Sequence, residues 1–141
     1  MRIVLALVVG AMLGIAGWTL AQEGHGKITR KTLLAQDVIE KVDGKDAKAT
    51  MLEVTIDPGQ SGAPHRHPGP VFGYVLEGEY EWAINDQPAK KLKVGDTFYE
   101  PTMSLHRVSR NPSDKNKTRI LAVLLHPRDA KQISIPESEK K

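Results

Sequence analysis

The sequence contains no cysteine among its 141 residues. This absence excludes disulfide bonds, thiolate metal sites, a cysteine nucleophile and a lipid anchor attached through a cysteine. Any metal ion that the protein binds must therefore be held by nitrogen or oxygen ligands.

The sequence also lacks a strong excess of charge of either sign. Its 20 Lys+Arg residues face 17 Asp+Glu residues, which gives a formal net charge of +3. No run rich in lysine and arginine lies among aromatic residues, so nucleic-acid binding is not expected. A Ser-His-Asp pattern, a phosphate-binding P-loop and a dinucleotide-binding glycine fingerprint are absent as well.

The long apolar run of the sequence is confined to residues 1–21. Arg2 supplies a positive start, and an uncharged, mostly apolar stretch follows it. The small residues Thr19 and Ala21 stand at the −3 and −1 positions of a cleavage site that would leave Gln22 as the new N-terminus. This layout predicts a secretory signal peptide. An uncleaved membrane anchor is the alternative, because the run just reaches the roughly 18–20 residues that cross a bilayer. Either way we expect a periplasmic or secreted protein.

The segment after the leader, residues 22–48, is interpreted as a polar lead-in followed by an edge element. Residues 31–41 fit an amphipathic helix and an edge strand equally well, because their apolar positions match neither period clearly. Residues 42–48 are expected to form a turn.

Short alternating segments separated by turn residues fill the chain from residue 49 to residue 127. The 12 glycines and 9 prolines of the sequence punctuate these segments every few residues. The pattern predicts seven or eight strands and hence an all-β barrel or sandwich, followed by a polar tail over residues 128–141. The expected strands are residues 49–57, 71–76, 79–84, 89–94, 97–100, 105–109 and 118–126.

Three histidines are the candidate functional residues. His65 and His67 are two residues apart, and in a strand side chains at this spacing leave on the same face. His106 follows about forty residues later, in another expected strand. Three imidazoles from these two segments could converge on one metal ion. The alternative is two surface histidines in a loop, with His106 as a core or surface residue.

The spacing of glycine, proline and histidine around these residues resembles the two sequence motifs of the cupin superfamily. Gly59, the pair His65 and His67, and Gly78 match the first motif; Gly95, Pro101 and His106 match the second. The resemblance implies a jelly-roll β-barrel with a divalent metal ion at its centre and a homodimer formed by paired strand edges.

The sequence departs from the two motifs at three positions. Val71 stands where the first motif has a glutamate ligand, and Met103 replaces a glycine of the second. Arg110 occupies the place of an asparagine, with Asn111 directly after it. The ligand set implied by the resemblance is thereby reduced to His65, His67 and His106.

Three neutral imidazoles suit iron, manganese, zinc, nickel or copper. In ligand set the sequence resembles three-histidine cupins that act as dioxygenases or lyases. This resemblance implies a metal-dependent oxygenase or lyase acting on a small organic molecule. Two alternatives stay open: a non-catalytic cupin that binds or senses a small molecule, and a barrel without metal. The membrane would be a partner only if residues 1–21 are not cleaved.

Five aromatic residues lie in the expected strands and are interpreted as barrel core or as pocket lining: Tyr74, Tyr80, Trp82, Phe98 and Tyr99. Arg66 lies between His65 and His67, so its side chain is expected to point away from a metal site.

Overall fold

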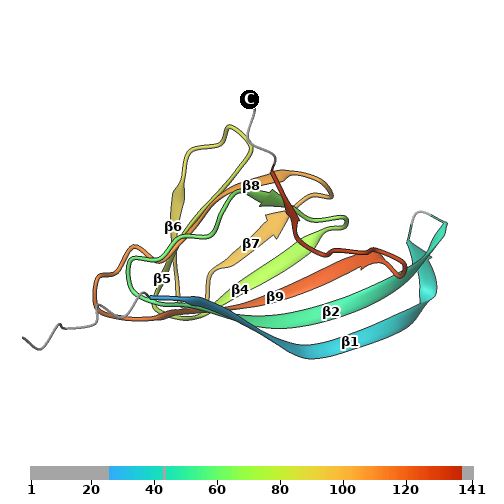
Figure 1. The fold of residues 1–141 in the computed structure, drawn as a ribbon, viewed down its shortest axis with the longest axis horizontal. Coiled ribbons are helices and arrows are strands. Elements are labelled where there is room, and N and C mark those ends of the chain that lie inside the picture. The colour runs from blue at the N-terminus through green and yellow to red at the C-terminus, as the bar shows by residue number, and fades with distance from the viewer. Residues whose placement is uncertain (1–25, 43, 138–141) are drawn as a thin grey trace, which may run out of the picture.

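The computed structural model describes residues 26–42 and 44–137, without the side chain of Glu40 (Figure 1). The predicted leader, residues 1–21, and residues 138–141 lie outside this described part. The described residues contain no helix, so none of them belongs to a helix that is long and apolar enough to cross a membrane.

The described chain forms two five-stranded antiparallel sheets, as expected for an all-β jelly-roll barrel. One sheet has the order β1-β2-β9-β4-β7 and the other β10-β3-β8-β5-β6. Figure 1 shows β1, β2, β9 and β4 side by side, with β5, β6 and β8 above them. The strands are β1 (Ile28–Val42), β2 (Lys45–Ile56), β3 (His65–Arg66), β4 (Val71–Glu77), β5 (Glu79–Ile84), β6 (Lys90–Lys93), β7 (Thr97–Glu100), β8 (Leu105–Arg110), β9 (Thr118–Pro127) and β10 (Ile135–Pro136).

The alternation of buried and exposed residues along the strands explains where the core lies. In β4, Val71 and Val75 are buried while Phe72 and Tyr74 are exposed. In a strand, successive side chains point to opposite faces, so each sheet sends every second residue inward. One inner cluster gathers around Tyr80, and a second one combines Leu52, Val71, Ala122 and Leu124.

The ambiguous segment over residues 31–41 is a strand at the edge of the sheet. It lies within β1, which pairs with β2 in a long antiparallel hairpin. The expected turn over residues 42–48 is wrong in its extent, because the strand pairing continues to Val42 and Lys45. Gly44 lies at the hairpin tip with a φ of 73°, a conformation that favours glycine. Backbone pairing therefore overrides the polar composition of this stretch.

The polar segment after β9 is not a frayed tail as far as the structure describes it. Its β10 pairs with β3, placing Ile135 opposite Arg66 and Pro136 opposite His65. The Arg66 guanidinium donates from Nε and Nη2 to the two carboxylate oxygens of Glu137, at 2.8 and 3.0 Å. The partner strand β3 is distant in sequence from this segment, so the composition of the segment does not reveal the pairing. The pairing places the segment beside the strand that carries His65.

Candidate metal centre

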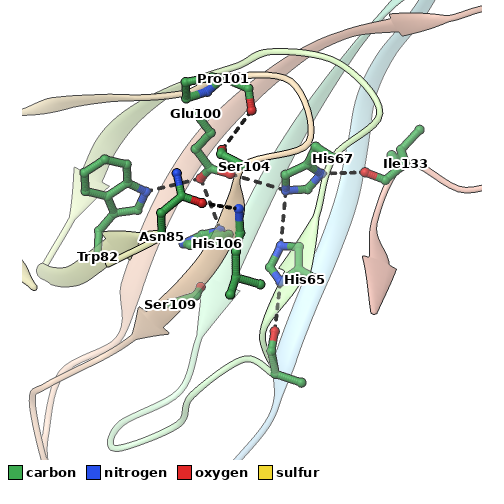
Figure 2. A network of polar contacts seen from close by, with 12 residues as sticks. His65, His67, Trp82, Asn85, Glu100, Pro101, Ser104, His106, Ser109 and Ile133 are labelled. Carbon is green, nitrogen blue, oxygen red and sulfur yellow. Dashed lines mark hydrogen bonds and ion pairs between the residues drawn. The ribbon is translucent and has the colours of Figure 1, made fainter. Parts of the chain in front are cut away.

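The pairing of β3 with β8 brings the three predicted histidines together. His65 lies directly opposite His106 in this antiparallel pair, and His67 follows immediately after β3. One ligand nitrogen from each ring lies within 4.8 Å of the others. Figure 2 shows the three rings converging, with the carboxylate of Glu100 beside two of them. Arg66 points away from this cluster, as expected, toward Glu137 and the backbone oxygen of Met103.

One nitrogen of each ring has a polar partner. His65 Nδ1 donates to the carbonyl of Ala63 at 2.8 Å, and His67 Nδ1 donates to the carbonyl of Ile133. His106 Nε2 lies 3.3 Å from the hydroxyl of Tyr80. A carbonyl oxygen only accepts hydrogen bonds, so in the neutral rings of His65 and His67 the proton must be on Nδ1 and Nε2 carries a lone pair.

The other nitrogen of each ring is left without a donor. His65 Nε2 and His67 Nε2 lie 3.1 Å apart, which in the neutral rings sets two lone pairs against each other. His106 Nδ1 is buried and has no hydrogen-bond partner. A cation between these nitrogens would satisfy all three. Carbonyl partners such as those of His65 and His67 are a usual way in which metal-binding histidines are oriented. The residues present therefore fit a divalent metal ion.

The surroundings of the histidines favour their neutral form, which is the form that binds metal. Burial lowers the pKa of His65 and lowers that of His67 to about 4. Burial also lowers the pKa of His106, to about 3, with a further contribution from its two histidine neighbours. At neutral pH a metal ion would not need to displace protons from these rings.

A cavity of about 90 Å³ opens beside the histidines. This volume is well below the roughly 300–1,000 Å³ of pockets for drug-sized ligands, so it leaves room only for a very small molecule. The walls are mainly apolar, with a few polar side chains. The apolar lining residues are Leu52, Val54, Val71, Phe98, Ile120, Ala122, Leu124 and Ile133, and the polar ones besides the histidines are Arg30, Tyr80, Glu100, Ser109 and Ser134.

The five aromatic residues divide between the inside and the outside of the barrel. Tyr80 and Phe98 line the cavity, and Trp82 is buried with the core. Tyr74 and Tyr99 are exposed on the outer face. The Tyr80 hydroxyl lies 2.9 Å from Ser109 Oγ, and burial raises the pKa of this tyrosine. Tyr80 is therefore a neutral hydrogen-bonding group on the cavity wall.

Glu100 is the residue at the site that sequence reasoning missed. It is only 1% exposed. Its Oε1 lies 3.1 Å from His106 Nδ1 and its Oε2 lies 3.6 Å from His67 Nε2. Burial raises the pKa of this carboxyl to about 7. A signal existed in the alternation of β7, where Glu100 follows Phe98 by two residues and so shares its inward face.

The departures from the second motif have structural explanations. Met103 adopts a φ of 59°, the left-handed conformation in which glycine is the usual residue. Its N–H donates to the carbonyl of His67 at 2.9 Å, which fixes this turn against β3. Asn111 is fully buried and donates to the carbonyls of Ile56 and Asn116. It therefore closes the loop before β9 and lies outside the cavity lining.

Comparison of the sequence with protein families gives one match, in which the model of the family described as Cupin domain covers residues 52–124. This range is just over half of the chain and includes all three histidines. No functionally curated protein matches the chain significantly.

Solved structures with the same fold come from several bacteria. A conserved protein with a double-stranded β-helix domain from Klebsiella pneumoniae is 21% identical, with a TM-score of 0.59, over 81% of this chain and 88% of that one. KdgF from Halomonas sp. is 24% identical, with a TM-score of 0.55, over 72% and 81%. DMSP lyase DddQ from Ruegeria pomeroyi is 20% identical, with a TM-score of 0.60, over 87% of this chain but 59% of that chain. At these identities the similarity shows the fold alone.

Proposed function

The chain belongs to the Cupin domain family, and we propose that it is a metalloprotein with one divalent ion bound by His65, His67 and His106. From the leader over residues 1–21 we also propose that it is exported. The observation that carries the proposal is the contact between His65 Nε2 and His67 Nε2 at 3.1 Å. Both rings use their other nitrogen to donate to a backbone carbonyl. This arrangement is unfavourable without a cation and favourable with one.

The bound ion is proposed to be iron, manganese, zinc, nickel or copper, because imidazole nitrogen suits these metals. A bound ion of this kind supplies Lewis acidity to a coordinated small molecule and, for a redox metal, electron transfer. The chain's own contribution is to fix the tautomer of His65 and His67 through two backbone carbonyls and to surround the site with mainly apolar side chains.

The proposed substrate is a small organic molecule with an apolar body and one anionic group. The cavity of about 90 Å³ limits the size of the molecule, and its apolar walls favour the body. Arg30 lies on the wall, and none of the ion pairs among the described residues involves its guanidinium. An arginine without a carboxylate partner is suited to bind a carboxylate or a similar anion. The proposed chemistry is an oxygenase or lyase reaction.

A non-catalytic binding or sensing role is the second candidate. It is favoured by Val71, which presents an apolar wall where the family motif has a carboxylate. In this role the metal would hold an anionic ligand without converting it.

The metal content of the protein purified without a polyhistidine tag tests the proposal. We expect about one transition-metal ion per chain, which is lost in His65→Ala and in His106→Ala and kept in the control His126→Gln. Turnover of a panel of diketones, thiols and catechols by the loaded protein separates the enzyme from the binding protein. Wild type that stays empty after reconstitution would show a metal-free barrel and overturn the proposal.

Export is proposed from the leader over residues 1–21, and its test is the N-terminus of the protein recovered from the periplasm or medium of a bacterial host. Gln22 as the first residue would show cleavage, whereas an intact N-terminus in the membrane fraction would show an anchor.

A homodimer is proposed because β1 is an edge strand that exposes large apolar side chains. Leu33 and Leu34 are each 45% exposed and Ile39 is 97% exposed. An exposed strand edge of this kind readily pairs with another strand. Sedimentation velocity should give the mass of two chains, and Ile39→Lys should shift the protein toward one.

A further inference from the structure

We propose that Glu100 on β7 is a fourth protein ligand of the metal ion. It would replace the glutamate ligand of the first motif, whose position in this sequence is occupied by Val71. This inference rests on the proposed three-histidine metal site and deepens it. It changes the predicted site from three neutral ligands to three neutral ligands and one anion.

The register of the sheet places Glu100 where a side chain from position 71 would also project. β4 and β7 are antiparallel neighbours, and Val71 is directly opposite Glu100 in their pairing. Directly opposite residues point to the same face, with Cβ atoms about 4.5–5.5 Å apart. Both side chains are buried, at 2% and 1% exposure. A carboxylate on β7 can therefore reach the region that a glutamate on β4 would otherwise fill.

The distances between the polar atoms match those between ligands of one ion. Donor atoms that each lie about 2.0–2.2 Å from a metal are separated by roughly 2.8–3.6 Å in octahedral or tetrahedral geometry. Glu100 Oε1 is 3.1 Å from His106 Nδ1, and Glu100 Oε2 is 3.6 Å from His67 Nε2. The pair of nitrogens on His65 and His67 has the same separation, 3.1 Å.

The directions of these groups do not fit the alternative in which Glu100 merely orients His106 by a hydrogen bond. His106 Nδ1 has no hydrogen-bond partner even though Glu100 Oε1 is nearby, so an Nδ1–H would not point at that oxygen. The other nitrogen, Nε2, faces the Tyr80 hydroxyl. His106 Nδ1 and Glu100 thus lie side by side, as two ligands do (Figure 2).

One oxygen of the Glu100 carboxylate has no hydrogen-bond partner. Trp82 Nε1 donates to Oε1 at 3.2 Å, whereas the buried Oε2 has no hydrogen-bond partner. An ionised carboxylate in such a site is costly unless a cation compensates it. Trp82 is accordingly a positioning residue that holds the carboxylate beside His67 and His106. An oxygen anion in the ligand set makes the site better suited to harder ions such as manganese and iron than three imidazoles alone would be.

The experiment moves the carboxylate between the two strands. Affinities for Zn²⁺ and Co²⁺ are measured by competition with a chromophoric chelator, and the visible spectrum of bound Co²⁺ reports its coordination. The variants are Glu100→Val, Glu100→Gln and the exchange Val71→Glu/Glu100→Val, which keeps one valine and one glutamate on the pair. Glu79→Gln, an exposed glutamate on β5, is the matched control.

Loss of the ligand should weaken Zn²⁺ binding by about 100-fold or more, because the loss of an outer-shell partner alone typically costs 10–100-fold. We expect this loss and a changed Co²⁺ spectrum in Glu100→Val, near wild-type affinity in the exchange variant, and no change in Glu79→Gln. Circular dichroism of each apo variant shows whether it is folded, and Glu100→Gln serves if Glu100→Val is not.

Two results overturn the inference in distinguishable ways. Equal affinity and equal Co²⁺ spectra in wild type and the folded Glu100 variants would show that Glu100 is no ligand, while the three-histidine site would stand. Wild type without measurable affinity would instead remove the histidine site itself.

Discussion

Buried histidines give the metal-free protein a pH dependence with a definite sign. Burial lowers the pKa of His67 to about 4 and of His106 to about 3, from an ordinary value of 6.5. Between these values the unfolded chain binds more protons than the fold, so stability falls as the pH decreases from 6.5 toward 4. Each histidine contributes at most about 1.4 kcal/mol per pH unit in its window.

Glu100 acts in the opposite direction between pH 4.5 and about 7, because burial raises the pKa of its carboxyl. The lowered pKa values of His67 and His106 together outweigh the raised pKa of Glu100. The free energy of unfolding should therefore still increase from pH 4.5 to 6.5. Urea unfolding of the chelator-treated protein at several pH values in this range checks the prediction. His67→Gln should flatten the dependence, and an unchanged slope in this variant would contradict the account.

At the residue scale, the sequence predicted that the three histidines form one metal site. It did not predict that Glu100 lies beside them. The spacing of His65 and His67 is local, and the second motif pointed to His106. The approach of Glu100 depends on the register of β4 against β7, which pairs it with Val71. The alternation of β7 indicated that Glu100 points inward. A register between strands some thirty residues apart is a tertiary property, so no local pattern revealed that the carboxylate lies beside the histidines.

Within β4, Gly73 is required by the packing of the neighbouring strand. A Cβ at this position would lie 1.9 Å from the ring of Phe98, which lines the cavity. Gly73→Ala should therefore destabilise the fold by about 1–3 kcal/mol, as overpacked cores do. At Gly62 a Cβ would make only ordinary contacts of 3.6 Å or more, so Gly62→Ala is the matched control. The measurement is the midpoint of thermal unfolding of both variants. Equal midpoints would show that Phe98 does not require a glycine at position 73.

At the level of the element, the segment around β10 helps to orient His67, one of the proposed metal ligands. The segment that carries β10 also carries the Ile133 carbonyl, which accepts the hydrogen bond of His67 Nδ1. A chain that ends at Ser134 loses β10, and the orientation of His67 should loosen. We expect zinc affinity to fall by roughly 10–100-fold, the usual cost of losing an outer partner of a ligand.

The control for this truncation is a chain that ends at Glu137, which keeps β10. It should bind zinc as the full chain does, measured by the same chelator competition. Equal affinity in both truncated chains would show that β10 has no part in holding His67.

Strands with clean alternation, such as β5 and β9, were predictable from the sequence. The extent of β2 and the existence of β10 were not, since both form through backbone pairing in polar stretches. A polar strand has no hydrophobic period to reveal it, and its partner supplies the stabilisation.

For the whole molecule, the metal site joins strands that are distant in sequence and should stabilise the fold. An ion that binds only the folded state adds about 2.7 kcal/mol at a free concentration of 100 times its dissociation constant. We expect zinc to raise the midpoint of thermal unfolding of wild type and to leave that of His106→Ala unchanged. An equal rise in both proteins would point to binding elsewhere.

The barrel fold was predictable because two separate features of the sequence indicate it. The alternation of short segments predicted an all-β fold, and the glycine and histidine spacing identified the family. Export and dimerisation remain predictions, since the leader lies outside the described residues and a single chain has no partner strand.

X-ray absorption spectroscopy of the zinc-loaded wild-type protein tests the three-histidine site most directly. We expect one ion per chain, with the scattering pattern of three imidazole rings whose nitrogens lie about 2.0–2.1 Å from the zinc. A shell of oxygen atoms with no imidazole scattering would place the ion on the surface and contradict a site built from His65, His67 and His106.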